Sequence, residues 1–187
     1  MTDEKPQRRP TVVLVGTLDT KGREYAFLRD RIRARDVDVL LVDAGILSEP
    51  LAKPDVTRQE VAAAAGADVQ ALADAGDRSA AIEVMGRGAT ELILRLQAAG
   101  RLDAIGALGG TGGTTLATHV MRAFPVGVPK LMVSTVASGN TNPYVGHVDV
   151  TMTYSVVDVA GINRISAKIL ANAAGTLVGM ATEPTVE

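Results

Sequence analysis

Residues 11–43 read TVVLVGTLDTKGREYAFLRDRIRARDVDVLLVD, and this stretch decides the fold. Residues 11–16 are a short β-branched run that ends at a glycine, which is typical of a strand buried on both faces of a parallel sheet. Residues 24–35 then carry apolar side chains at helical spacing, and 37–42 form a second apolar run. This order predicts a right-handed βαβ unit.

The rest of the chain continues the alternation. A capping-box pattern at 57–60 predicts a short helix, and one apolar face predicts a long helix over 79–99. Gly86 and Gly88 fall inside the long helix, where glycine costs about 1 kcal/mol relative to alanine. Either the helix is interrupted there or another segment packs very close. Further strands are expected over 103–108, 130–134 and 148–153, and further helices over 114–124 and 158–180.

Strands that alternate with helices predict an α/β fold. We expect a Rossmann-like three-layer αβα sandwich with a five-stranded, mainly parallel sheet of order 2-1-3-4-5 and 148–153 at its edge. Residues 11–181 would form this single domain, with 1–10 as a disordered leader and 182–187 as a tail. Ligands of such sheets bind beyond the carboxyl ends of the strands where the order reverses, here between the first and third strands.

Composition excludes several classes of function. The 187 residues are 47% hydrophobic, enough for a full core, and the absence of cysteine excludes thiol nucleophiles, thiolate metal sites and disulfides. It also fits a reducing compartment, so we expect a cytoplasmic protein. A net charge of -2 argues against nucleic acid or acidic lipid as a partner. No apolar stretch is long enough for a membrane span.

The loop after the third predicted strand is rich in glycine. Residues 109–115 read GGTGGTT, so the backbone can adopt positive φ and present its N–H groups to an anion at the positive end of the next helix. Threonine hydroxyls can add donors. The alternative is a tight strand-to-helix turn that only needs glycine. The candidate anion-binding residues are Gly109, Gly110, Thr111, Gly112, Gly113 and Thr114.

The loop after the first strand should face that glycine-rich loop. It starts at Gly16; Lys21 can pair with a phosphate, and Thr17 and Thr20 can donate to one. A carboxylate beside a bound phosphate needs a cation or a donor group between them, so Asp19 is the candidate ligand of a Mg²⁺ ion. Simple helix capping by Asp19 and Thr20 is the alternative.

The loop after the fourth strand is crowded with hydroxyl and amide groups. Ser134, Thr135, Ser138, Gly139 and Asn140 can complete a polar pocket from the same edge of the sheet. An ordinary turn cluster has the same composition.

Other chemistry is poorly supported. Neither the first loop nor the glycine-rich loop reads GxxxxGK[ST] or GxGxxG, so Asp43 is a strand-end cap rather than a ribose ligand. Ser138 lacks the GxSxG context of a hydrolase nucleophile, and the only histidines, His119 and His147, do not form a metal-binding pattern. Asp158 is expected to cap the last helix. No catalytic residue is assigned.

Taken together, these segments of the chain resemble a known family. The chain shares motifs, in the same order, with the N-terminal domain of an uncharacterised family of bacterial, fungal and plant proteins. That family includes the tomato-mosaic-virus resistance protein. The resemblance spans about 11–180. The segments that carry it are GTLDTKGREYAFLRD, VDAGIL, AIEVMGRGA, LGGTGGTTLAT, PVGVPKLMVSTVASGNTNPYVG and YSVVDVAGINRIS.

The resemblance implies a nucleotide-binding domain that forms a homodimer. ATP would be lined by 16–21, 109–114 and 134–140. Family members usually continue into a second α/β domain, so this chain, which stops at Glu187, is expected to be a fragment or to have a partner chain that carries that domain. Thr111 stands where family members often have serine, which keeps the hydroxyl. The antiviral role of the plant protein is not transferred.

Three functions therefore stay open. The first is ATP binding, with phosphates on the glycine-rich loop, Mg²⁺ near Asp19, and hydrolysis undecided. The second is an enzyme or subunit acting on a small carboxylate or sugar acid, because the same donors suit a carboxylate. The third is an oligomeric assembly module whose small residues form a subunit interface. Those residues are Gly86, Gly88, Gly161, Gly175 and Gly179.

Overall fold

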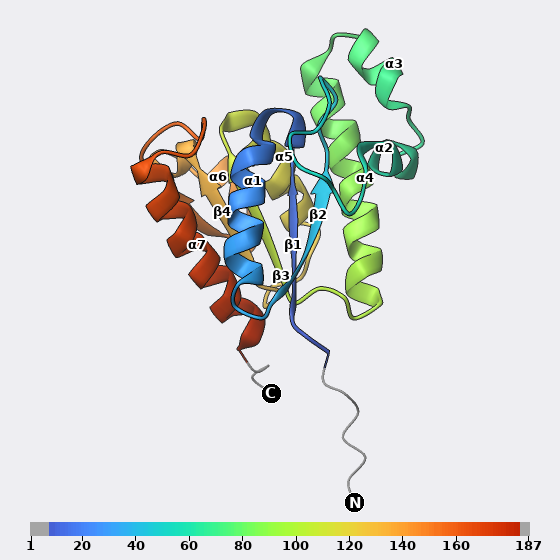
Figure 1. The fold of residues 1–187 in the computed structure, drawn as a ribbon. Helices are drawn as coiled ribbons and strands as arrows, with labels where there is room; N and C mark the ends of the chain where they lie inside the picture. Colours follow the sequence, from blue (N-terminus) through green and yellow to red (C-terminus); the bar gives the residue numbers. More distant parts are fainter. Residues whose placement is uncertain (1–7, 184–187) are drawn as a thin grey trace, which may run out of the picture.

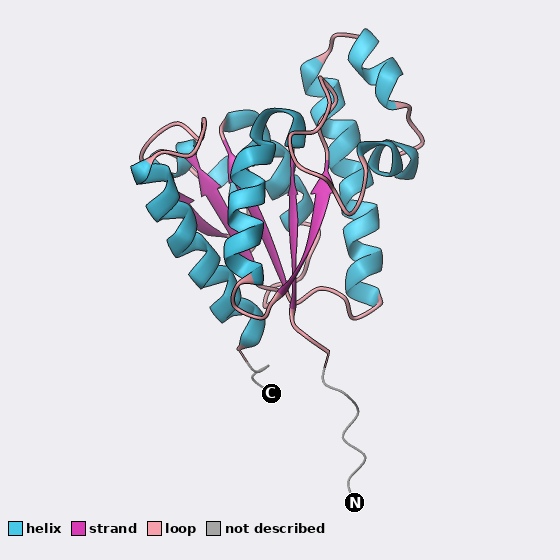
Figure 2. Ribbon diagram, viewed as in Figure 1, coloured by secondary structure: helices cyan, strands magenta, loops and turns pink. Residues whose placement is uncertain are grey.

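The computed structural model describes residues 8–183 and contains the expected sandwich (Figures 1 and 2). Its sheet has the order β2-β1-β3-β4-β5, and every neighbouring pair is parallel. The fold class and strand order predicted from the sequence are confirmed. The strands are β1 (Thr11–Gly16), β2 (Asp38–Asp43), β3 (Ala104–Gly109), β4 (Lys130–Ser134) and β5 (Thr151–Tyr154).

Helices cover both faces of the sheet (Figure 1). One apolar core lies between the sheet and the helices α1 (Leu18–Arg33) and α7 (Arg164–Thr182). A second core lies on the other face, against α2 (Arg58–Ala64), α4 (Arg78–Ala98) and α5 (Thr111–Met121). β1 and β3 are buried along their whole length, because both of their faces are covered. The shorter elements are α3 (Val69–Asp74), the 3-10 turn η1 (Thr135–Ser138) and α6 (Asn142–Val145).

Three helices begin where the sequence pattern did not predict. α1 begins at Leu18 rather than near 24, and α5 begins at Thr111 rather than 114. α7 begins at Arg164 because Asn163 and Ser166 form a capping box. The prediction that Asp158 caps this helix is therefore wrong.

The two glycines inside α4 serve close packing within the chain. A Cβ at Gly88 would lie 2.9 Å from the carbonyl carbon of Val61 in α2, and closer still to its oxygen. A Cβ at Gly86 would lie 3.1 Å from the ring of His119 in α5. The expectation of very close packing is confirmed. These glycines serve contacts between helices of one chain.

The ends of the chain are only partly described. Residues 1–7 of the expected leader and 184–187 of the expected tail lie outside the described residues. Arg8 forms an ion pair with Asp103 at 2.8 Å, and α7 continues through Thr182. Within 8–183, no helix combines the length and the apolar character that a membrane crossing requires.

Candidate functional site

β1 and β3 separate at their carboxyl ends. β1 pairs with β2 as far as Gly16 but with β3 only as far as Leu14. The buried hydroxyl of Tyr25 fills the gap: it accepts the Leu108 N–H at 3.0 Å and lies 2.7 Å from the Val15 carbonyl oxygen. Burial raises the pKa of Tyr25 above its usual value. Gly16 makes room for this ring, since a Cβ there would lie 2.6 Å from a Tyr25 ring carbon.

The glycine-rich segment is the first turn of α5 rather than a loop. Gly110 is the N-cap and offers no side chain, and the first helical hydrogen bond joins the Thr114 N–H to the Gly110 carbonyl at 2.9 Å. Within the described chain, the N–H groups of Thr111, Gly112 and Gly113 have no acceptor. Three free donors at the positive end of an eleven-residue helix are suited to an anion.

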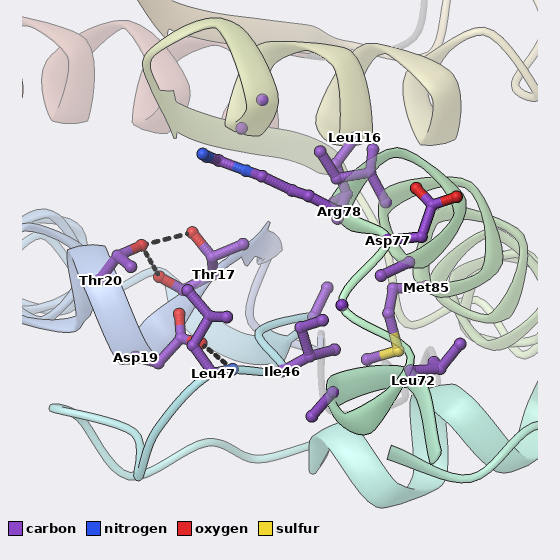
Figure 3. Close-up of a pocket in the computed structure, with 17 residues that line it drawn as sticks. Thr17, Asp19, Thr20, Ile46, Leu47, Leu72, Asp77, Arg78, Met85 and Leu116 are labelled. Atoms are coloured by element: carbon purple, nitrogen blue, oxygen red, sulfur yellow. Dashed lines mark hydrogen bonds between the residues drawn. The ribbon is translucent and has the colours of Figure 1, made fainter. Parts of the chain in front are cut away.

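A cavity of about 140 Å³ lies beside this turn, at the carboxyl edge of the sheet (Figure 3). Thr17, Asp19 and Thr20 from the start of α1 line it together with Gly112 and Gly113. The sequence-based expectation that the first and third loops share one site is consistent with this arrangement. Most of the remaining wall is apolar and includes Ile46, Leu47, Leu72, Ile82, Met85 and Leu116.

Asp19 is the buried acid of the cavity. Asp19 is only 6% exposed. Its Oδ2 accepts a hydrogen bond from the Leu47 N–H at 2.8 Å, and its Oδ1 has no hydrogen-bond partner within the described residues. Gly45 packs against the carboxylate, because a Cβ there would lie 2.6 Å from the Asp19 Cγ. Asp19 does not cap α1: that N-terminus is held by Asp43, whose Oδ1 accepts the Leu18 N–H at 3.1 Å. One carboxylate oxygen is thus buried beside the cavity without a hydrogen-bond partner.

The other polar groups of the first loop differ in their access to the cavity. The hydroxyls of Thr17 and Thr20 are hydrogen bonded to each other at 2.8 Å (Figure 3). Lys21 occupies a kink in α1, with φ -125° and ψ 15°, and does not line the cavity. The structure therefore brings two threonines but not the lysine to the site.

The loop after β4 is largely occupied by its own contacts. The buried hydroxyls of Thr114 and Ser134 lie 2.7 Å apart; Thr114 also donates to the Gly110 carbonyl, and Ser134 accepts the Val136 N–H. These bonds fix α5 against β4. Gly110 and Gly109 lie beside that junction. None of the remaining predicted residues of this loop lines the cavity, namely Thr135, Ser138, Gly139 and Asn140.

Arg78 was not predicted as a site residue, although it lines the cavity. A Cβ on Gly112 would lie 3.3 Å from its Nη2, so the guanidinium lies beside the first turn of α5. Its side chain extends from α4 toward the side of the cavity formed by Thr17 and Thr20 (Figure 3). The available signal was an arginine directly after the N-cap Asp77, where a cation opposes the helix dipole.

Asp43 has the structural role that its strand-end position predicts. Besides the Leu18 N–H it accepts the Gly45 N–H at 2.9 Å, and its Oδ2 lies 2.8 Å from both Nε and Nη2 of Arg58. Arg58 also donates to the Ser48 carbonyl. The pair is almost fully buried and ties the long excursion after β2 to the sheet. Asp43 therefore has little capacity left for a ligand.

Metal binding by protein groups alone is not supported. Across residues 8–183, no three side chains of histidine, aspartate or glutamate gather in a way that could hold an ion. His119 and His147 do not contribute to the cavity. A cation at this site would need Asp19 together with oxygen atoms of a bound ligand.

Comparison with known proteins gives the chain a family. The model described as "Uncharacterised protein family (UPF0261) N-terminal domain" matches residues 10–185. The chain belongs to this family. A UPF0261 protein of Clostridium tetani is 46% identical over 90% of the chain, and the chain spans only 42% of that protein's length. The tomato (Solanum lycopersicum) protein named ToMV susceptible protein tm-1(GCR26) is 31% identical over 91% of the chain and 25% of its own length. Among solved structures, Drosophila melanogaster DJ-1beta covers 92% of both chains, at 15% identity and a TM-score of 0.39.

Proposed function

We propose that this UPF0261 domain binds ATP or a related nucleotide, with its phosphates at the N-terminus of α5. The observation that carries the proposal is the set of three free N–H groups at residues 111–113, of which Gly112 and Gly113 line the cavity together with Arg78. Helix N-termini with small residues are recurrent phosphate sites in α/β folds, and this one lies where the strand order reverses.

The apolar part of the cavity supports a ligand with a nonpolar portion. Leu72, Met85 and Leu116 offer surfaces on which a base can pack. The cavity of about 140 Å³ is smaller than the roughly 300 Å³ from which ligand pockets usually start, so it encloses part of a nucleotide. The remainder of the ligand lies outside the cavity or displaces a wall.

Asp19 is the proposed Mg²⁺ ligand. Its unpartnered Oδ1 is an oxygen of the type that Mg²⁺ prefers, and Mg²⁺ in nucleotide sites commonly binds one or two carboxylates together with phosphate oxygens. Bound there, the ion would supply charge compensation between the carboxylate and the phosphates. The site offers no assigned nucleophile or general base, so the proposal is binding and leaves hydrolysis out.

A thermal-unfolding screen tests the proposal. ATP, ADP, NAD and sugar acids are compared with and without Mg²⁺, and a ligand present at a hundred times its Kd should stabilise the fold by about 2.7 kcal/mol, or about 5–10 °C. Gly112→Ala places a methyl group beside Arg78 with neighbours no closer than 3.3 Å, so the fold should persist while ATP binds about 10-fold more weakly. Gly179→Ala, on open surface in α7, is the matched control.

The outcomes separate the alternatives. Absence of an ATP or ADP shift, or equal ATP affinity of Gly112→Ala and wild type, contradicts the nucleotide proposal. A shift with a sugar acid alone favours the second candidate, a site for a small carboxylate, which the limited volume of the cavity also suits. Loss of the fold in Gly112→Ala would indicate a purely structural turn.

We further propose that the domain acts as a cytoplasmic homodimer, joined to or paired with the region that extends its relatives. The share of 42% of the Clostridium tetani relative supports the second part. Exposed apolar side chains at Tyr154, Val156, Ile162 and Ile165, near the edge strand β5 and the start of α7, offer surface for such contacts. Light scattering on the purified chain tests dimerisation, and a monomeric mass would contradict it.

A further inference from the structure

Arg78 is a free cation at the cavity. Of the ion pairs and side-chain hydrogen bonds within 8–183, none involves its guanidinium. By contrast, Arg87 and Arg95 on the same helix pair with glutamates one turn away. Arg78 is also the first residue of α4, where a positive charge is unfavourable toward the helix dipole. Its position therefore does not serve the stability of α4.

The position suits an anion held from two sides. The Arg78 Nη2 lies 3.3 Å from where a Gly112 Cβ would be, so guanidinium and free N–H groups of α5 border the same space. Arginine binds phosphate and carboxylate through charge-assisted hydrogen bonds, and a helix N-terminus adds backbone donors. The buried Asp19, whose Oδ1 has no hydrogen-bond partner, is a separate sign that this cavity receives a ligand, one that brings a cation or a donor group beside its anion.

The segment that precedes Arg78 has little of its surface packed against the domain. We call residues 66–77, which include α3, the α3 segment; α3 itself has no buried residue and stands away from the body of the domain (Figure 1). Gly66 (φ 70°) and Gly76 (φ 66°) bound it, in a conformation that glycine adopts readily. Its inner side nevertheless supplies Leu72 and Ala73 to the cavity wall.

We propose that Arg78 selects ligands that carry an anionic group at the α5 N-terminus, and that the α3 segment closes over them. The proposal rests on the proposed function for the location of the phosphates, and it adds the residue that reads their charge. A cavity of about 140 Å³ encloses more of a nucleotide only if a wall moves, and the α3 segment is the wall with the least packing to lose. Attraction between the bound anion and Arg78 then holds that wall closed.

The test is a charge series on two variants. Binding of ATP, ADP, adenosine, sugar acids and inorganic pyrophosphate is measured by calorimetry for wild type, Arg78→Gln and Arg87→Gln. Arg87 lies on the same helix, is exposed and does not line the cavity. We expect Arg78→Gln to bind every anionic ligand about 10-fold more weakly and adenosine unchanged, and Arg87→Gln to match wild type. Amide hydrogen exchange in 69–77 should slow with ligand in wild type and not in Arg78→Gln.

The results test ligand selection by Arg78 and closure of the α3 segment separately. Equal anion affinity in Arg78→Gln and wild type overturns the selection by Arg78, and unchanged exchange in 69–77 overturns the closure. If wild type binds pyrophosphate or a sugar acid through Arg78 but does not bind ATP, the proposed nucleotide function fails while the inference about Arg78 stands. If wild type binds none of these anions, both fail.

Discussion

Replacing Gly88 with alanine should destabilise the domain, although the same change stabilises most helices. The added Cβ would lie 2.9 Å from the Val61 carbonyl carbon, and closer still to its oxygen. Favourable carbon contacts lie at about 3.5–4.0 Å, so α2 and α4 would have to separate by about 0.6–1.1 Å or more. The obstacle is backbone within a helix capped by Thr57, and it cannot turn aside as a flexible side chain would.

The magnitude follows from two opposing terms. Overpacking of this kind costs about 1–3 kcal/mol, and backbone as the obstacle places Gly88→Ala near the upper end. The gain in helix propensity is about 1 kcal/mol. The net loss of about 2 kcal/mol corresponds to a fall in Tm of about 4–8 °C for a domain of this size.

Thermal unfolding followed by circular dichroism measures the effect. Gly175→Ala is the matched control, because Gly175 lies within α7 and an added Cβ meets nothing within 4 Å. That variant should gain up to about 1 kcal/mol, or about 2–4 °C. A Tm for Gly88→Ala equal to or above that of wild type would refute the reasoning about the α2–α4 contact.

Four further predictions concern buried or half-buried polar groups. Tyr25→Phe should cost about 1–3 kcal/mol in urea unfolding, because the Leu108 N–H loses its acceptor; an unchanged midpoint would contradict this. Burial raises the pKa of Tyr25, so above pH 10 the unfolded chain releases the phenol proton and the folded chain keeps it. The stability of the domain therefore falls as the pH rises. Absorbance at 295 nm should show that one of the three tyrosines ionises only on unfolding. The pKa of His119 is lowered, first by desolvation and then by Arg122; Arg87 adds to this effect and Glu83 opposes it. As the pH falls below about 6.5, the unfolded chain therefore takes up the proton before the folded chain does, and this contribution to stability is lost. Proton NMR of the His119 ring checks this order. Arg58→Met should cost about 3–5 kcal/mol, because it leaves Asp43 buried without its cation; a loss below 1 kcal/mol would show that solvent reaches Asp43.

The features of the fold that depend on neighbouring residues were predictable from the sequence. The run at 11–16 is buried on both faces as its composition implied, and the capping box at Thr57 and Glu60 is present with its hydrogen bonds. The start of α7 was missed because Ile162 and Ile165 continue a helical spacing although both are exposed. The capping box at Asn163 uses serine in place of the usual glutamate or glutamine, which weakens the signal.

The candidate site was predicted in part. The rule of the strand-order reversal located the first and third loops, and these supply Asp19 and Gly112 to one cavity. Arg78 and Leu72 reach the same cavity from a long excursion whose path depends on tertiary packing, which no local spacing encodes. Ser134 was proposed for a ligand because its type suits one, yet its hydroxyl is engaged with Thr114.

The direction of α7 carries the chain away from the cavity. The helix begins near the carboxyl edge of the sheet and ends at Thr182, close to the edge where β1 begins (Figure 1). Nineteen residues at 1.5 Å each carry the chain about 28 Å away from the cavity side. A surface anchor or a fluorescent label attached beyond either described end would therefore leave the cavity facing solvent, so immobilised protein can be titrated without blocking its own site.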